Sequence, residues 1–134
     1  MQKIIAVLML SVISISAEPK KILVMNISKD VVSDWAHGAP HADLVSVTSE
    51  TVMEHIVDAH GFIGNITPEQ VRAGKNLEWV QTLSAGVEQV LHLSGGSDLR
   101  DSDIVLTNNQ IVQGPEIADH AMAMLLAFTR DIPS

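Results

Sequence analysis

The sequence predicts an α/β protein with a flavodoxin-like, doubly wound parallel sheet of about five strands. Two observations support this fold class. From residue 20 onward, short β-branched runs alternate with helix-like segments, which is typical of parallel strands joined by crossover helices. The chain has 134 residues, 46% of them hydrophobic, which suits one domain with an extensive core and excludes a disordered chain.

The first two strands are expected at residues 21–27 (KILVMNI) and 43–48 (DLVSVT), which are rich in β-branched residues. The segment at residues 36–43 (AHGAPHAD) is predicted to be a loop. Residues 49–61 carry apolar side chains at helical spacing, with Ser49 as a possible N-cap and Gly61 as the stop. A helix is therefore predicted there.

The second half of the sheet follows the same alternation. The third strand is expected at residues 61–63, and Thr67, Pro68 and Gln70 then form a helix start with a capping box. The fourth strand is expected at residues 77–83 (LEWVQTL) and the fifth at 103–108 (DIVLTN). Between them, residues 86–93 (GVEQVLHL) predict a helix that the two glycines at 95–96 end.

The last predicted helix, at residues 114–130, differs from the others. It has Pro115 and Glu116 in its first turn and Arg130 at its end, in keeping with the helix dipole. Its apolar residues lie on nearly every side, and such a helix must be buried nearly all round. We therefore expect an interdomain or dimerisation helix: either it dimerises, or the chain continues in a longer relative. The apolar residues are Ile117, Ala118, Ala121, Met122, Met124, Leu125, Leu126 and Phe128.

The N-terminus resembles a secretory signal peptide. Lys3, an apolar run and small residues up to Ala17 match the three regions of such a leader, which residues 1–17 would form. The protein would then be exported, for example to a periplasm; otherwise it would be cytoplasmic. An apolar lead-in to the first strand is the alternative, and the run is too short for a membrane span, which needs about 20 apolar residues.

Composition excludes several classes of function. Sixteen acidic against eight basic residues give a net charge of −8, which argues against binding nucleic acid. The chain has no cysteine, so disulfides, thiolate chemistry and Cys-type zinc sites are excluded.

Three further patterns are weighed and set aside. The acidic and histidine residues at positions 34, 37, 41 and 43 could hold a metal, but glycine and proline between them prevent helical i, i+4 spacing. Asp119 and His120 are neighbours on a helix and point about 100° apart, so structural roles are expected for both. Asn26 and Asn65 begin N-I-(S/T) triplets that fit the glycosylation pattern, for which chance matches are common.

Two longer segments carry a family resemblance. Residues 76–90 (NLEWVQTLSAGVEQV) and 102–133 (SDIVLTNNQIVQGPEIADHAMAMLLAFTRDIP) resemble the N-terminal part of the D-isomer-specific 2-hydroxyacid dehydrogenases. The resemblance runs from about residue 20 to the end and is strongest from Asn76. It implies a flavodoxin-like substrate-domain part at residues 20–112. Members interconvert 2-oxo acids and D-2-hydroxy acids by hydride transfer with NAD or NADP, and a homodimer is expected for the intact enzyme.

The resemblance also implies site residues. In the family, backbone N–H groups of the small-residue turn hold the substrate carboxylate, and here these are Ala85, Gly86 and Val87. The turn opens a predicted helix, and helix N-termini offer free N–H groups to anions. Some members use an asparagine six residues before the acidic residue of the last helix; counted back from Asp119, that position is Gln113.

The family's catalytic arginine, acid and histidine belong to regions beyond residue 134, and no G-x-G-x-x-G fingerprint is present. The sequence therefore assigns no catalytic, cofactor-binding or metal-binding residue, and it predicts a partial enzyme without its cofactor domain, inactive alone. An exported, non-enzymatic flavodoxin-like binding or interaction module stays open as the alternative. A receiver-like signalling domain is the weakest reading, because no lysine follows the fifth strand.

Overall fold

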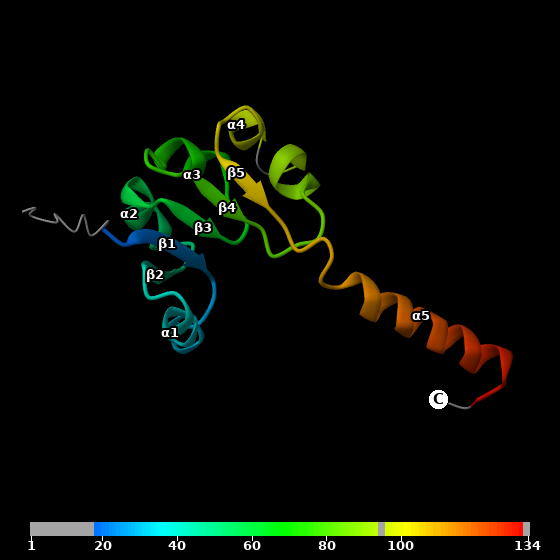
Figure 1. Cartoon of the computed structure of the whole chain (residues 1–134). Coiled ribbons are helices and arrows are strands. Elements are labelled where there is room, and N and C mark those ends of the chain that lie inside the picture. Colours follow the sequence, from blue (N-terminus) through cyan, green and yellow to red (C-terminus); the bar gives the residue numbers. More distant parts are fainter. Residues whose placement is uncertain (1–17, 94–95, 133–134) are drawn as a thin grey trace, which may run out of the picture.

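The computed structural model describes residues 18–93 and 96–132, so the predicted leader at 1–17 lies outside the described residues. Five parallel strands form one sheet in the order β2-β1-β3-β4-β5. This is the strand order of a flavodoxin-like sheet, and it confirms the predicted fold class (Figure 1). The strands are β1 (Lys20–Met25), β2 (Ala42–Val47), β3 (Gly61–Ile63), β4 (Trp79–Gln81) and β5 (Val105–Thr107).

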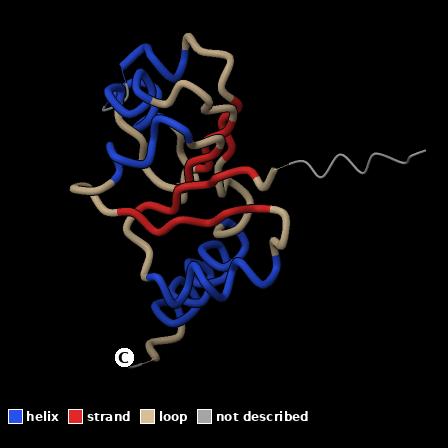
Figure 2. Tube along the Cα trace, turned by 90° about the vertical axis from the view of Figure 1, so that its left-hand side faces the viewer, coloured by secondary structure: helices blue, strands red, loops and turns tan. Residues whose placement is uncertain are grey.

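Helices lie on both sides of the sheet (Figures 1 and 2). On one side, α1 packs along β2; on the other are α2, α3 and α4. The helical segments are α1 (Lys29–Gly38), α2 (Val52–His55) with the 3-10 turn η1 (Ile56–Asp58), α3 (Pro68–Ala73), the π-helical η2 (Gln89–Leu93), α4 (Gly96–Arg100) and α5 (Gly114–Thr129). None of these described helices is long and apolar enough to cross a membrane.

The main core lies between the sheet and the α2–α3–α4 side. Alternate strand residues point to the same face, and Leu23, Val47, Phe62 and Val80 are each at most 1% exposed there. They belong to one cluster with buried helix side chains: Val52, Ile56, Val71, Val90 and Leu99.

Several predicted elements are confirmed with small changes of length. The capping box of α3 is present: Gln70 N donates to Thr67 Oγ1 at 3.3 Å, and Thr67 N donates to Gln70 Oε1 at 2.9 Å. Gly74 is the C-cap of this helix. The helix predicted at 49–61 is shorter, because Thr48 and Thr51 form a turn in which Thr51 Oγ1 accepts from Thr48 N at 3.0 Å. Thr51 rather than Ser49 precedes the helix.

Two predictions are wrong in part. The loop predicted at residues 36–43 instead contains the end of α1 and the start of β2. Val32 is the one buried residue of α1, so this helix has little apolar periodicity to reveal it. The single helix predicted at 86–93 is replaced by η2 and α4, and Gly96 begins a helix rather than ending one. Each of the two short segments contributes one side chain to the core, Val90 and Leu99.

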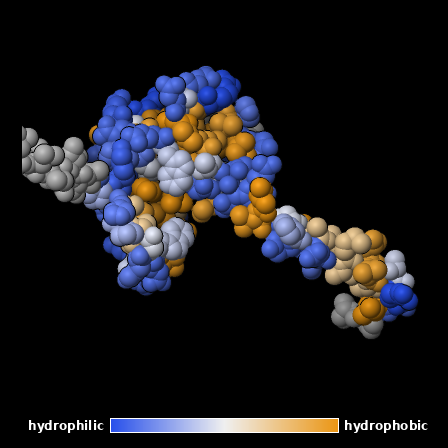
Figure 3. All heavy atoms as spheres, in the orientation of Figure 1, coloured by the Kyte–Doolittle hydropathy of each residue, from blue (hydrophilic) through white to orange (hydrophobic). Residues whose placement is uncertain are grey.

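The last helix is confirmed, but its surroundings differ from the expectation. None of the residues of α5 is buried; Ile117, Leu125 and Phe128 are 63%, 54% and 84% exposed. In Figure 1, α5 leaves the sheet domain as a separate arm, and Figure 3 shows apolar residues along its outer half. Within one chain, this helix has no surface against which to bury its apolar sides.

Candidate functional site

The small-residue turn at residues 84–87 follows β4 and is fastened to the chain that follows β5. Asn109 N donates to Ser84 O at 3.1 Å, and Asn109 Nδ2 donates to Leu83 O at 3.2 Å. Asn108 Nδ2 donates to Ala85 O at 2.7 Å. Three successive backbone carbonyl groups are thus held from one side.

This attachment determines where the N–H groups of the turn point. In a trans peptide the N–H is directed opposite to the C=O of the same unit, and no cis peptide occurs in the described chain. Because the carbonyl groups of Ser84 and Ala85 point at the two asparagines, the N–H groups of Ala85 and Gly86 point away from them. Neither these groups nor the N–H of Val87 donates to an acceptor within residues 18–93 and 96–132.

Gly86 is exposed, whereas Ala85 and Val87 are half-buried. A Cβ atom placed on Gly86 would collide with the carboxylate of Glu88, which folds back over the turn. An anion bound to the N–H group of Gly86 would therefore lie close to a negative side chain. Glu88 is exposed and flexible, so it can swing away.

A pocket of about 340 Å³ opens beside the turn, at the carboxyl ends of β1, β3 and β4. In this strand order the chain leaves β1 and β3 in opposite directions, and ligands of doubly wound sheets bind at such a switch point. Ser84 belongs to both the pocket and the turn. The lining residues are Met25, Asn26, Ile27, Gly64, Asn65, Leu83 and Ser84.

Two strained backbone positions shape this pocket. Asn26 has φ +56° and Gly64 has φ +135°, both in the region that L side chains rarely adopt. Their N–H groups are used within the sheet, Asn26 N donating to Val47 O at 2.9 Å and Gly64 N to Gln81 O at 2.8 Å. Asn65 Oδ1 accepts from Thr82 Oγ1 at 3.3 Å. The rim is consequently polar and fixed in place.

The two N-I-(S/T) triplets have the same place in the fold. Asn26 follows β1 and leads through Ser28, the N-cap residue of α1; Asn65 follows β3 and leads through Thr67, the N-cap residue of α3. The positive end of the α1 dipole therefore lies next to the pocket, which favours an anionic ligand. Sequence reasoning did not assign Asn26 and Asn65 to the site, although their identical position after two strands was a usable signal.

Gln113 is placed apart from the other predicted residues. It is exposed, immediately precedes α5, and its carbonyl oxygen accepts from Ile117 N at 3.2 Å. The structure brings Ala85, Gly86 and Val87 together in one turn, and within the described residues no hydrogen bond joins Gln113 to them. The supporting residues that sequence reasoning missed are Asn108 and Asn109.

No titratable group with a shifted pKa lies at the turn or the pocket among the described residues. The pKa of Asp58 is lowered by the hydrogen bond from Lys21 Nζ at 2.6 Å, and that of Glu78 by the one from Lys20 Nζ at 2.9 Å. Both are surface pairs at the other end of the strands. The described residues also contain no group of three or more side chains placed to hold a metal.

The residues present do not fit a dinucleotide. Gly61 lies within β3 against Trp79, and Gly64 forms a turn against Met25, so neither provides a glycine-rich cradle at a helix start. The arrangement can bind and orient an anion, and no step of cofactor chemistry is derived from it.

Comparison with known proteins supports the fold. No protein-family profile and no curated protein matches the sequence. Among solved structures, a D-isomer specific 2-hydroxyacid dehydrogenase family protein from Aeromonas salmonicida subsp. salmonicida superposes with a TM-score of 0.65 at 20% identity. The match covers 86% of this chain but only 37% of that one. The fold that the sequence resemblance implied is confirmed.

Proposed function

We propose that this chain supplies the substrate-carboxylate clamp of an NAD(P)-dependent oxidoreductase that acts on D-2-hydroxy acids and 2-oxo acids. One observation carries the proposal: Asn108 and Asn109 hold the carbonyl groups of the turn, so that the N–H groups of Ala85 and Gly86 are presented outward. The fold of the structural neighbour and the resemblance of residues 76–90 support the same chemistry.

The clamp would work by charge-assisted hydrogen bonds. A carboxylate accepts from successive backbone N–H groups more strongly than a neutral carbonyl does, because the acceptor is ionised. The groups are held in place before the ligand arrives, so little conformational entropy is lost on binding. The adjacent pocket, with Asn26, Asn65 and Ser84 on its rim, would take the rest of a small acid.

The proposal assigns binding and orientation to this chain and no chemical step. Nicotinamide supplies the hydride in such a reaction, and a separate acid/base moves the proton; none of the residues in residues 18–93 and 96–132 is assigned either role. The chain alone is therefore expected to bind a 2-oxo acid but not to oxidise NADH. Homodimerisation of the intact enzyme, a contribution of Gln113 to the substrate site and export directed by residues 1–17 belong to the same proposal.

Titration calorimetry tests the clamp directly. Pyruvate is expected to bind, and pyruvamide, which lacks the charge, is not; NADH should leave the affinity of pyruvate unchanged. Gly86→Val should abolish binding because it places bulk over the N–H groups. Gly38→Val is the matched control, since a Cβ at Gly38 meets nothing within 4 Å. Equal affinity for pyruvate and pyruvamide, or unchanged binding in Gly86→Val, would contradict the proposal.

A further inference from the structure

One half of the sheet has an uncovered side. Over β3, β4 and β5, on the side opposite the main core, the strands present Gly61, Trp79 and Val105, and no described helix packs there. Val105 is 59% exposed. Parallel sheets are almost always covered on both faces, so this surface, which we call the open face, lacks a layer that the fold normally has.

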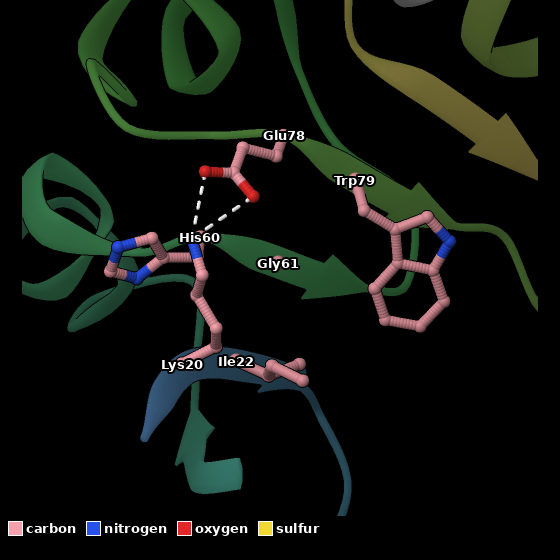
Figure 4. A pocket seen from close by; sticks show the side chains of 6 residues that line it. All are labelled: Lys20, Ile22, His60, Gly61, Glu78 and Trp79. Carbon is pink, nitrogen blue, oxygen red and sulfur yellow. Dashed lines mark hydrogen bonds and ion pairs between the residues drawn. The ribbon is translucent and has the colours of Figure 1, made fainter. Parts of the chain in front are cut away.

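The open face contains an apolar hollow of about 190 Å³, shown in Figure 4. Trp79 lies across Gly61: a Cβ there would come within 3.0 Å of Trp79 Cε3 and 3.2 Å of Ile22 Cγ1. The Lys20–Glu78 ion pair, 2.9 Å long, lies beside this floor in the figure. The hollow thus offers a flat aromatic floor with one polar edge.

The same chain carries a helix without a partner surface. Six large apolar side chains of α5 are between 48% and 84% exposed: Ile117, Met122, Met124, Leu125, Leu126 and Phe128. Contiguous apolar surface of this kind is uncommon on a soluble monomer and marks an interaction surface.

Hydrogen bonds direct α5 away from the open face of its own chain. Trp79 Nε1 donates to Thr107 Oγ1 at 2.9 Å, and Thr107 Oγ1 donates to Gln81 Oε1 at 2.6 Å. Gln81 Nε2 donates to Asn109 Oδ1 at 3.1 Å, and Asn109 is in turn bonded to Leu83 and Ser84. The chain therefore leaves β5 in a fixed direction, outward in Figure 1. Folding α5 back onto its own sheet would have to break this network at Asn109.

We propose that α5 of a second copy covers the open face, and that two copies exchange their α5 helices to form a twofold dimer. Each copy has one projecting helix and one open face, as a closed isologous exchange requires. Burying a large apolar side chain removes on the order of 100 Å² from water. Two α5 helices with six such side chains each therefore reach the roughly 1,200–2,000 Å² of a stable interface, even before the covered faces are counted. The inference does not depend on carboxylate binding.

The test measures mass and the environment of Trp79 together in the full chain. Light scattering at increasing concentration gives the dimer, while a Trp35→Phe background leaves Trp79 as the single fluorophore. Association should shield Trp79 from acrylamide quenching at least twofold. Leu125→Glu on α5 and Val105→Lys on the open face should each weaken the dimer at least tenfold. Val57→Lys is the matched control, since Val57 is 54% exposed on η1.

Each other outcome contradicts the proposal. A monomer at every concentration with an exposed Trp79 means that the open face has no occupant from a second copy. A monomer with a shielded Trp79 means that α5 folds onto its own sheet. A dimer that Val105→Lys leaves intact means that two α5 helices pair with each other instead.

Discussion

At the scale of single residues, Glu88 is the side chain that most directly opposes the proposed clamp. Its carboxylate folds over Gly86, where it would repel a bound carboxylate. Two unit charges about 4 Å apart near a protein surface repel by up to about 4 kcal/mol, and less when the side chain can move away. Glu88→Gln is therefore expected to strengthen pyruvate binding about fivefold.

Glu69→Gln is the matched control for this prediction, because it removes one exposed negative charge on α3 and should leave the affinity unchanged. Affinity from calorimetry would decide between them. Weaker binding in Glu88→Gln would mean that the carboxylate supports the site instead of opposing it.

Gly64 is the residue whose backbone the pocket depends on most. At φ +135° any side chain is strained, and a Cβ would come within 2.7 Å of Met25 Cβ. Gly64→Ala should lower the free energy of unfolding by about 1–3 kcal/mol in urea denaturation. Gly38→Ala, at an unobstructed position in α1, should be neutral or stabilising by about 0.4–1 kcal/mol. Equal effects of the two substitutions would show that the φ of Gly64 is not constrained.

At the scale of elements, the two N-cap positions after β1 and β3 make a natural comparison. Thr67 closes a capping box with Gln70, whereas the side chain of Ser28 makes no cap hydrogen bond. Thr67→Ala should therefore cost about 1 kcal/mol of unfolding free energy, and Ser28→Ala only a few tenths. Urea denaturation of the two variants measures this difference, and a larger loss in Ser28→Ala would contradict the assignment.

The elements also show what the sequence could predict and why the rest escaped it. The strands and α3 were predicted because β-branched runs and a complete capping box are local signals. The helix α1 was missed because Val32 is its one buried residue. At the turn, the small residues indicated a site, but the role of Asn108 and Asn109 depends on β5 lying beside β4. That pairing joins residues more than 20 positions apart and leaves no local pattern.

At the scale of the whole molecule, the alternation of strands and helices was sufficient to predict the parallel sheet and its flavodoxin-like order. The apolar composition of α5 correctly indicated a helix made for burial. Its direction could not be predicted, because it is set by the hydrogen bonds from Gln81 to Asn109 and from Asn109 to Leu83. The open face and the exposed α5 are two consequences of that one fixed direction.

The central claim is that the turn after β4 binds a carboxylate through its backbone. Amide-resolved NMR of the 15N-labelled chain, titrated with pyruvate, tests it most directly because it reports on each N–H separately. The account predicts saturable downfield shifts that are largest at Ala85 and Gly86, with Val87 next, and no such shifts with pyruvamide. Shifts that are absent from these amides, or largest around Lys20 and Lys21 at the other end of the strands, would contradict it.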